Sequence, residues 1–254
     1  MQMRLMVVSH KDYWMPDDPI YLPVQVNSGG KPSFHPQWQR DDQGQNISSK
    51  NLHYCELTAL YWGWKNLQAD YIGLVHYRRY FARRRMGNKY QRIATQPDIE
   101  RKLQCADVIL PTRRHYWIEN NYTQYIHAHH ENDLVYTRQI IAERYPAYLP
   151  AWERVMHKTS GHRFNLFAMK TSLLHAYCEW LFDILFELEK RLDISHYNAL
   201  DTRVFGLVAE RLLDVWIETN QIHYVEMPVV YLENQHWGRK IRLFLERKWR
   251  GRKL

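Results

Sequence analysis

The chain has 254 residues, 45% hydrophobic and 24% charged, which is a globular composition and excludes a disordered or fibrous chain. A mean hydropathy of -0.60 and the lack of a long uncharged apolar run exclude a transmembrane helix. The net charge is +8, but from Arg239 onward eight basic residues face only one acidic residue, Glu246, so this tail carries +7. The preceding residues hold 27 basic against 26 acidic side chains, so the body is nearly neutral and the basicity belongs to an appendage.

Other features narrow the class of protein further. The chain has three cysteines, and their spacing is not that of metal ligands. An odd number of this kind supports neither a disulfide framework nor a zinc site and fits buried thiols in a reducing cytosol. The apolar run that follows Arg4 is too short for the core of a signal peptide. We therefore expect a cytoplasmic protein.

The first half of the chain predicts strands and one long helix. Strands are expected over residues 5–9 and 20–26, and a buried strand over 71–75. Between them, Ser48 or Ser49 is a natural N-cap for a helix that carries apolar residues at helical spacing.

The second half continues the alternation. A short helix is expected from Asp98, and a strand over 107–110 stops at Pro111. A helix capped by Asn132 or Asp133 precedes a strand over 163–169, and Thr171 or Ser172 caps a long amphipathic helix. A helix over 202–219 and a late strand over 224–232 complete the body.

This alternation predicts a single α/β domain over residues 1–238 with a mostly parallel central sheet, followed by a basic tail over 239–254. Ligands of such folds bind at the carboxyl ends of the strands. Glycine-rich dinucleotide and phosphate loops, the nucleophile elbow of serine hydrolases and the zinc-protease helix motif are all absent. The candidates that remain are polar residues just after strands and at helix starts.

Residues 46–51 form the first candidate. The N–H groups of a helix start, together with Lys50 and two hydroxyls, suit a phosphate or diphosphate. The alternative is plain capping of the helix by serine or asparagine. Residues assigned to donor binding in this segment are Asn46, Ser48, Lys50 and Asn51.

The second candidate is His76-Tyr77-Arg78-Arg79, directly after the strand over 71–75. Arginines at that point can neutralise a diphosphate leaving group. The alternative is a solvated basic turn, because three more arginines follow at 83–85.

Two further patterns carry chemistry-bearing residues. Residues 127–133 hold three histidines, Glu131 and Asp133, which are metal-ligand types, although capping and exposure explain them without a metal. Glu210, on an otherwise apolar helix and grouped with Asp201, Arg203, Arg211 and Asp214, is the candidate general base, with Asp201 as its reserve. The alternative for Glu210 is an ordinary solvent-facing helical glutamate.

Taken together, these segments resemble a bacterial family of capsule, exopolysaccharide and O-antigen synthesis proteins that includes galactofuranosyltransferases. The resemblance rests on residues 46–66 and 70–81, whose motif is long and specific, and on Val7-Val8-Ser9-His10-Lys11, Asp107-Val108-Ile109-Leu110-Pro111, Phe164-Asn165-Leu166-Phe167-Ala168-Met169-Lys170 and Ala209-Glu210-Arg211-Leu212-Leu213. It covers nearly the whole body and leaves the tail outside.

The resemblance implies a GT-A-like nucleotide-sugar transferase. Such folds usually deliver an Asp-x-Asp metal motif where this chain has the cationic segment 76–79, so no metal site or firm cofactor is predicted. The implied reaction is inverting transfer of galactofuranose from UDP-galactofuranose to an undecaprenyl-diphosphate-linked glycan. Donor contacts are assigned to Ser9, His10, Lys11 and the two candidate segments, and acceptor contacts to Asn165 and Trp64.

Three alternatives stay open. The first is another donor, such as UDP-galactopyranose. The second is a nucleic-acid-binding protein that uses the arginines and the tail. The near-neutral body and the absence of nucleic-acid-binding motifs argue against it, so no nucleic-acid partner is predicted. The third is a non-catalytic assembly partner.

In the tail, Ile241, Phe244, Leu245 and Trp249 share a helical face among cations, which predicts peripheral binding to the anionic inner face of the plasma membrane.

Overall fold

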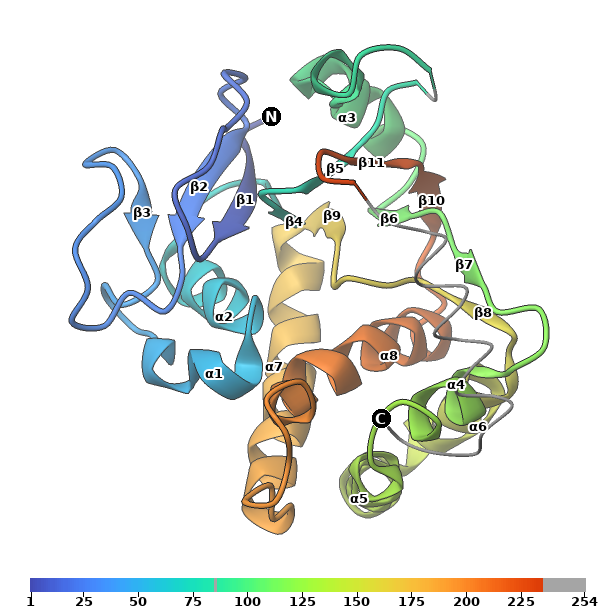
Figure 1. Ribbon diagram of the computed structural model, residues 1–254. Helices are drawn as coiled ribbons and strands as arrows, with labels where there is room; N and C mark the ends of the chain where they lie inside the picture. Colours follow the sequence, from blue (N-terminus) through green and yellow to red (C-terminus); the bar gives the residue numbers. More distant parts are fainter. Residues whose placement is uncertain (85, 235–254) are drawn as a thin grey trace.

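The computed structural model describes residues 1–84 and 86–234, which build a nine-stranded sheet with helices on both faces (Figure 1). Its main path runs β10-β6-β9-β4-β1-β2-β3, where the strands are β1 Met3–Ser9, β2 Tyr21–Gln25, β3 Gln39–Arg40, β4 Tyr71–His76, β6 Val108–Pro111, β9 Phe167–Lys170 and β10 Tyr224–Met227. On this path only β9 runs against the others, so the mostly parallel sheet is confirmed. Two short strands, β5 Arg79–Phe81 and β11 Val229–Tyr231, pair antiparallel and join the sheet through β4.

Strand β1 lies between two hydrophobic cores. Leu5 and Val7 pack on one face of the sheet and Met6 and Val8 on the other, as the two-residue period of a strand requires. All four are buried, which explains the continuous apolar run in the sequence.

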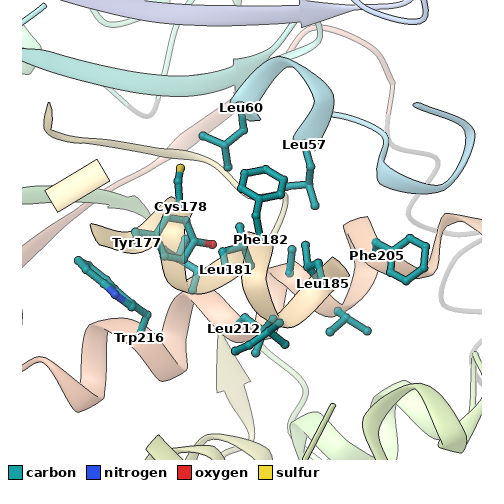
Figure 2. Close-up of a cluster of buried hydrophobic side chains, with 14 of the residues drawn as sticks. Leu57, Leu60, Tyr177, Cys178, Leu181, Phe182, Leu185, Phe205, Leu212 and Trp216 are labelled. Carbon is teal, nitrogen blue, oxygen red and sulfur yellow. The ribbon is translucent and has the colours of Figure 1, made fainter. Parts of the chain in front are cut away.

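The larger core lies between the sheet and three helices, α2 Leu57–Asn66, α7 Thr171–Arg191 and α8 Val204–Thr219. Figure 2 shows its centre, where Leu57 and Leu60 of α2 meet Leu181 and Phe182 of α7. The opposite face is covered by α3 Gln96–Leu103, whose Ile99 is fully buried.

The remaining elements extend the domain at its edges. Helices α4 Asn121–Ile126, α5 Glu131–Arg144 and α6 Leu149–His157 pack around α7 and α8. A two-stranded ribbon pairs β7 Arg114–His115 with β8 Ser160–Gly161, and short helical segments are α1 Asn51–Tyr54 and four 3-10 turns, η1 Ser48–Lys50, η2 Tyr90–Arg92, η3 Pro146–Tyr148 and η4 Asp201–Arg203.

Three predicted helix caps are wrong. The N-caps before η1, α5 and α7 are Ile47, His130 and Lys170, and none of them makes a side-chain cap hydrogen bond. In place of capping, the Ser48 hydroxyl donates to Asp41 at 2.6 Å and the Thr171 hydroxyl donates to the Ala69 carbonyl. These hydroxyls tie separate segments together, a tertiary role that local sequence does not reveal.

Several predicted elements have different bounds, and the late strand expected over 224–232 is two strands, β10 and β11, separated at Pro228. The helix expected from Ser48 breaks at Cys55, whose φ of +51° lies in the left-handed region. The strand expected over 163–169 begins only at Phe167, because Phe164 and Asn165 also have positive φ. The tail over 239–254 lies outside the described residues. Within residues 1–84 and 86–234, no helix combines the length and apolarity that a membrane span needs.

Candidate functional site

Three chain segments meet at one edge of the sheet. Strands β1 and β4 are parallel neighbours, with Val8 opposite His76, so the residues after both strands emerge side by side. Strand β9 runs antiparallel to β4, with Phe167 opposite Leu74, so the residues just before β9 reach the same edge. The topology therefore gathers the predicted residues after β1 and β4 with the turn at Phe164.

We call the side chains gathered there the edge cluster. They come from the ends of β1, β4 and β11, from β5, from the turn before β9, from the start of α2, and from η4 and α8. The edge cluster comprises His10, Lys11, Glu56, His76, Tyr77, Arg78, Arg79, Phe164, Asn165, Arg203, Glu210, Arg211 and Glu233.

His76 joins β4 to the turn before β9. Its Nε2 lies 2.7 Å from the Phe164 carbonyl, and because a carbonyl only accepts, Nε2 carries the proton. Burial, followed by the nearby Arg79 guanidinium, lowers the pKa of His76 to about 3. The imidazole is therefore neutral at physiological pH and acts as a fixed donor to the Phe164 backbone.

The Asn165 side chain has one possible orientation. Its Nδ2 donates to Glu56 Oε1 at 2.7 Å and to the Gly206 carbonyl at 3.1 Å. Both partners are acceptors, so the amide cannot be flipped, and its Oδ1 remains buried without a partner. Burial raises the pKa of Glu56, while the hydrogen bond from Asn165 acts in the opposite direction.

Glu210 projects from α8 into the same group. Its Oε1 accepts the Phe164 backbone N–H at 3.0 Å, and its Oε2 lies 3.6 Å from an Arg211 amino group. With 17% of its side chain exposed, the carboxylate is neither a solvent-facing helical glutamate nor sealed in the core. Glu210 is thus a fixed and accessible carboxylate, as a general base requires.

Arg79 lies at the centre of the edge cluster. Its guanidinium stacks over the Phe164 ring at 4.3 Å. Burial and the neighbouring Arg78 lower the pKa of Arg79, whereas Glu210 and Glu56 act to raise it. The alternative of a solvated basic turn therefore does not describe Arg79.

Unpaired polar atoms are concentrated in this group. Among the described residues, four buried side-chain nitrogen or oxygen atoms have no hydrogen-bond partner, and three of them are Arg79 Nε, Asn165 Oδ1 and Arg211 Nε. Each such atom costs about 1–3 kcal/mol of folding free energy. Each such group needs an explanation, and two of them, on Arg79 and Asn165, belong to neighbours of Phe164, so we take the edge cluster as the candidate site.

The mouth of the edge cluster is cationic and organised around Glu233. Lys11 Nζ and Arg78 Nη1 lie 3.2 and 3.0 Å from the two carboxylate oxygens. Burial acts to raise the pKa of Glu233, but hydrogen bonds from Arg78 and Lys11 outweigh it and keep that pKa below its ordinary value. Tyr77 supports both cations through its ring face, at 5.0 and 5.6 Å. Two cations arranged around one anion in this way can also hold a diphosphate.

The other donor segment lies farther along the same carboxyl edge, where β3 ends beside β2, and its side chains are bonded within the fold. We call Asn46, Ser48, Lys50 and Asn51 the turn cluster. Lys50 pairs with Glu189 of α7 at 2.7 Å, and Asn51 donates to the Thr58 hydroxyl and the Cys55 carbonyl. The Asn46 amide holds its own loop through the Asp42 and Gly44 carbonyls. No hydrogen bond, ion pair or ring contact joins these side chains to residues 76–79 in the part of the chain that the structure describes.

Three other predicted site residues also lie apart or act indirectly. Asp201 accepts from His129 at 2.7 Å, from Asn198 at 2.7 Å and is 3.3 Å from His130. Trp64 stacks on Phe182 and donates its indole N–H to His175. The Ser9 hydroxyl donates to the Lys11 carbonyl at 2.6 Å and so shapes the turn that presents Lys11.

The candidate metal segment is dispersed by its partners. His127 contacts Glu119, Glu131 accepts from Tyr122, and Asp133 accepts from two tyrosine hydroxyls. Across residues 1–84 and 86–234, no three histidine, cysteine or carboxylate side chains are grouped as metal ligands. In the edge cluster, β4 ends in a histidine whose Nε2 is occupied and in two arginines, a donor set that does not fit a divalent cation.

Sequence reasoning assigned no site role to three members of the edge cluster, Glu56, Phe164 and Glu233, and it grouped Arg203 and Arg211 with Glu210 without giving either a role. Arg203 donates to the Cys55 sulfur at 3.1 Å, directly before Glu56. Glu56 lies inside the long motif of residues 46–66, but nothing local distinguishes it from a helical glutamate. Its role depends on the break at Cys55 and on the distant Asn165.

A cavity of about 400 Å³ lies elsewhere, between α6, α8 and β10. Its charged lining residues are paired, Lys158 with Glu218 and Arg113 with Glu226. The edge cluster, by contrast, holds buried polar atoms without partners, and it is therefore the stronger candidate.

Comparisons with known proteins identify the fold and the family of the chain. The chain is similar to the apo structure of WbbM, a bifunctional glycosyltransferase, at 29% identity with a TM-score of 0.83 over 92% of this chain and 46% of that one. It thus spans about half the length of that protein, and the similarity confirms a GT-A-like α/β fold. No curated protein matches the chain. A family model described as a domain of unknown function, DUF4422, matches residues 4–221, which include most of the edge cluster, and the chain therefore belongs to this family.

Proposed function

We propose that this protein is a glycosyltransferase that uses a nucleotide-sugar donor in bacterial polysaccharide synthesis, with the edge cluster as its active site. The observation that carries the proposal is the convergence of a fixed carboxylate, unpaired buried polar atoms and a cationic mouth at the carboxyl ends of β1 and β4. The similarity to a solved bifunctional glycosyltransferase supports the same class of reaction.

The donor diphosphate lies, in this proposal, against His10, Lys11 and Arg78, and replaces Glu233 as the anion between the two cations. Bidentate arginine donors and a lysine match phosphate oxygens well. Arg79, half-buried behind them, adds positive charge where the leaving group gains negative charge. These cations supply the stabilisation that a divalent metal gives in related folds.

The reaction then proceeds with inversion in a single displacement. The Glu210 carboxylate takes the proton of an acceptor hydroxyl, whose oxygen forms a bond to the anomeric carbon of the sugar. The bond from that carbon to the phosphate oxygen breaks, and UDP leaves with the electron pair. His76 and the Phe164 N–H hold Glu210 in position through the turn before β9.

The finer assignment follows from the sequence resemblance. We propose UDP-galactofuranose as donor and an undecaprenyl-diphosphate-linked glycan as acceptor, with UDP-galactopyranose as the second candidate donor. Asn165 lies in the turn before β9, next to Phe164, whose backbone N–H donates to Glu210, and it is the residue proposed to border the acceptor.

A donor-panel assay tests the function. Purified protein, a synthetic lipid-diphosphate acceptor and a set of UDP-sugars are combined, and the product is identified by linkage analysis. Turnover with one UDP-sugar and an inverted anomeric configuration support the proposal, whereas no transfer or hydrolysis from any nucleotide sugar contradicts it.

Addition of EDTA tests the cationic leaving-group site separately. Because Lys11, Arg78 and Arg79 are proposed to replace a metal, turnover is expected to survive chelation. Complete loss that manganese or magnesium restores would contradict this part of the proposal and redirect attention to Glu131 and Asp133.

A further inference from the structure

A short loop between β7 and α4 displays two neighbouring apolar side chains. Trp117 is 85% exposed and Ile118 is 57% exposed. Among the large hydrophobic side chains exposed in the described part of the chain, these are the only two that are consecutive. Trp14, also exposed, packs its ring against Tyr90, whereas the ring neighbour of Trp117 is the exposed His115, 5.8 Å away.

The backbone of Trp117 has an unfavourable conformation. Its φ is +63°, in the left-handed region that a bulky aromatic residue rarely adopts. A strained conformation of this kind persists only when the surrounding structure imposes it. A tight turn closed by the Ile118 N–H and the Tyr116 carbonyl at 2.7 Å imposes this conformation and holds the indole in solvent.

The base of the loop is rigid. The Tyr116 N–H donates to the Thr159 carbonyl at 2.8 Å, next to the β7–β8 ribbon. The Tyr116 hydroxyl accepts from Nε of Arg163 at 2.6 Å, and Arg163 is 4% exposed. Trp117 and Ile118 therefore project from a fixed support beside the residue that precedes Phe164.

The charge next to the apolar tip is positive. Arg114 is exposed, lies over the Tyr116 ring at 5.6 Å and has no ion pair with any carboxylate in residues 1–84 and 86–234. An exposed tryptophan and isoleucine beside an unpaired arginine match the boundary between headgroups and acyl chains of an anionic bilayer. A glycan would use the indole face but has no need of the isoleucine or the cation.

We propose that the loop from Arg114 to Ile118 inserts its tip into the interfacial region of an anionic membrane. The contact does not depend on the basic tail or on the proposed reaction. If that reaction holds, the link from Tyr116 through Arg163 to the turn at Phe164 also sets the edge cluster close to the bilayer surface.

Co-sedimentation of the full chain with lipid vesicles tests the proposal. Vesicles of phosphatidylethanolamine and phosphatidylglycerol are compared with neutral phosphatidylcholine vesicles. The double variant Trp117→Ser/Ile118→Ser should weaken binding to the anionic vesicles about tenfold, since it removes most of the inserted apolar surface. Arg114→Ala should weaken it about fivefold at low salt and have little effect at high salt.

Matched controls separate the loop from general surface effects. Trp14→Ser removes another exposed tryptophan, and Arg101→Ala another exposed arginine, and both should bind vesicles as the parent does. All variants keep the tail, so differences report the loop, and unchanged thermal unfolding shows that the fold is intact. Equal vesicle binding by the double variant and the parent overturns the proposal. So does unchanged vesicle binding with lost affinity for a soluble oligosaccharide, which makes the loop a glycan contact.

Discussion

The turn cluster and the edge cluster carry similar residue types but use them differently. Both offer cations, amides and hydroxyls near the ends of secondary-structure elements, and both were assigned to donor binding from sequence. In the turn cluster each of these groups already has a protein partner, such as Asp41 for Ser48 and Glu189 for Lys50. In the edge cluster buried atoms of Arg79, Asn165 and Arg211 have none.

The difference teaches that residue type alone does not identify a binding site, and that unpartnered polar atoms beside a fixed carboxylate and exposed cations are a stronger indication. A hydrogen-bond network in which every group has a partner stabilises the fold. A network with unpaired groups can still form hydrogen bonds with a ligand or a transition state. Substitutions in the edge cluster should therefore lower turnover or UDP affinity, whereas substitutions in the turn cluster should lower the free energy of unfolding.

The largest effect is expected from Glu210→Gln. Removal of a general base typically lowers the rate about 10²–10⁴-fold, and the amide keeps the size of the side chain. Turnover at saturating donor and acceptor measures the loss, with UDP affinity as the check on binding. Glu218→Gln, on the same helix but paired with Lys158 and Arg154, is the control and should keep near-normal turnover. Near-normal turnover of Glu210→Gln would remove the carboxylate from the mechanism.

The edge cluster should also make the fold sensitive to acid. Because burial lowers the pKa of His76 to about 3 in the folded protein, only the unfolded chain takes up this proton as pH falls below the ordinary histidine value. Stability is therefore fully present above about pH 6.5 and falls by about 1.4 kcal/mol per pH unit toward pH 3 from this group. Urea unfolding between pH 7 and 4 measures the slope. His76→Gln should flatten it, and identical slopes in parent and variant would show that His76 does not remain neutral.

Donor affinity should separate the two cationic groups. Arg78→Ala removes a charge-assisted contact worth about 1.5–3 kcal/mol, so UDP binding should weaken about tenfold or more. Lys50→Ala is the matched variant in the turn cluster and should leave UDP affinity unchanged, because Lys50 pairs with Glu189 of α7 and makes no contact with residues 76–79 in the described part of the chain. Calorimetric titration with UDP measures both. Weaker binding in Lys50→Ala with unchanged binding in Arg78→Ala would reverse the two assignments.

The smallest effect is a loss of stability in the turn cluster. Ser48→Ala deletes the buried hydroxyl that donates to Asp41 at 2.6 Å, which should lower the free energy of unfolding by about 1–3 kcal/mol. Denaturant unfolding measures this change, and turnover should stay at the parent level. If Ser48→Ala instead has the stability of the parent but low turnover, the turn cluster is part of the active site and does not merely stabilise the fold.

The sequence predicts the longer strands β1 and β4 because their apolar runs are almost entirely buried, but it does not predict the short strands β3, β5, β7 and β8. The predicted helix caps are wrong because the hydroxyls of Ser48 and Thr171 donate hydrogen bonds to Asp41 and to the Ala69 carbonyl. The residues next to each serine or threonine in the sequence do not indicate these partners. At the site, His76, Arg78, Arg79 and Glu210 could be found because they follow a buried strand or interrupt an apolar helix face. Glu56 could not, since its burial depends on Cys55 with positive φ and on Asn165, 109 residues away in sequence.

The most direct test of the edge cluster is a crystal structure of the protein with bound UDP. The diphosphate is expected against Lys11 and Arg78 at the carboxyl ends of β1 and β4, with the Glu233 carboxylate displaced from between them. A diphosphate bound against Ser48 and Lys50 of the turn cluster would contradict the placement of the active site.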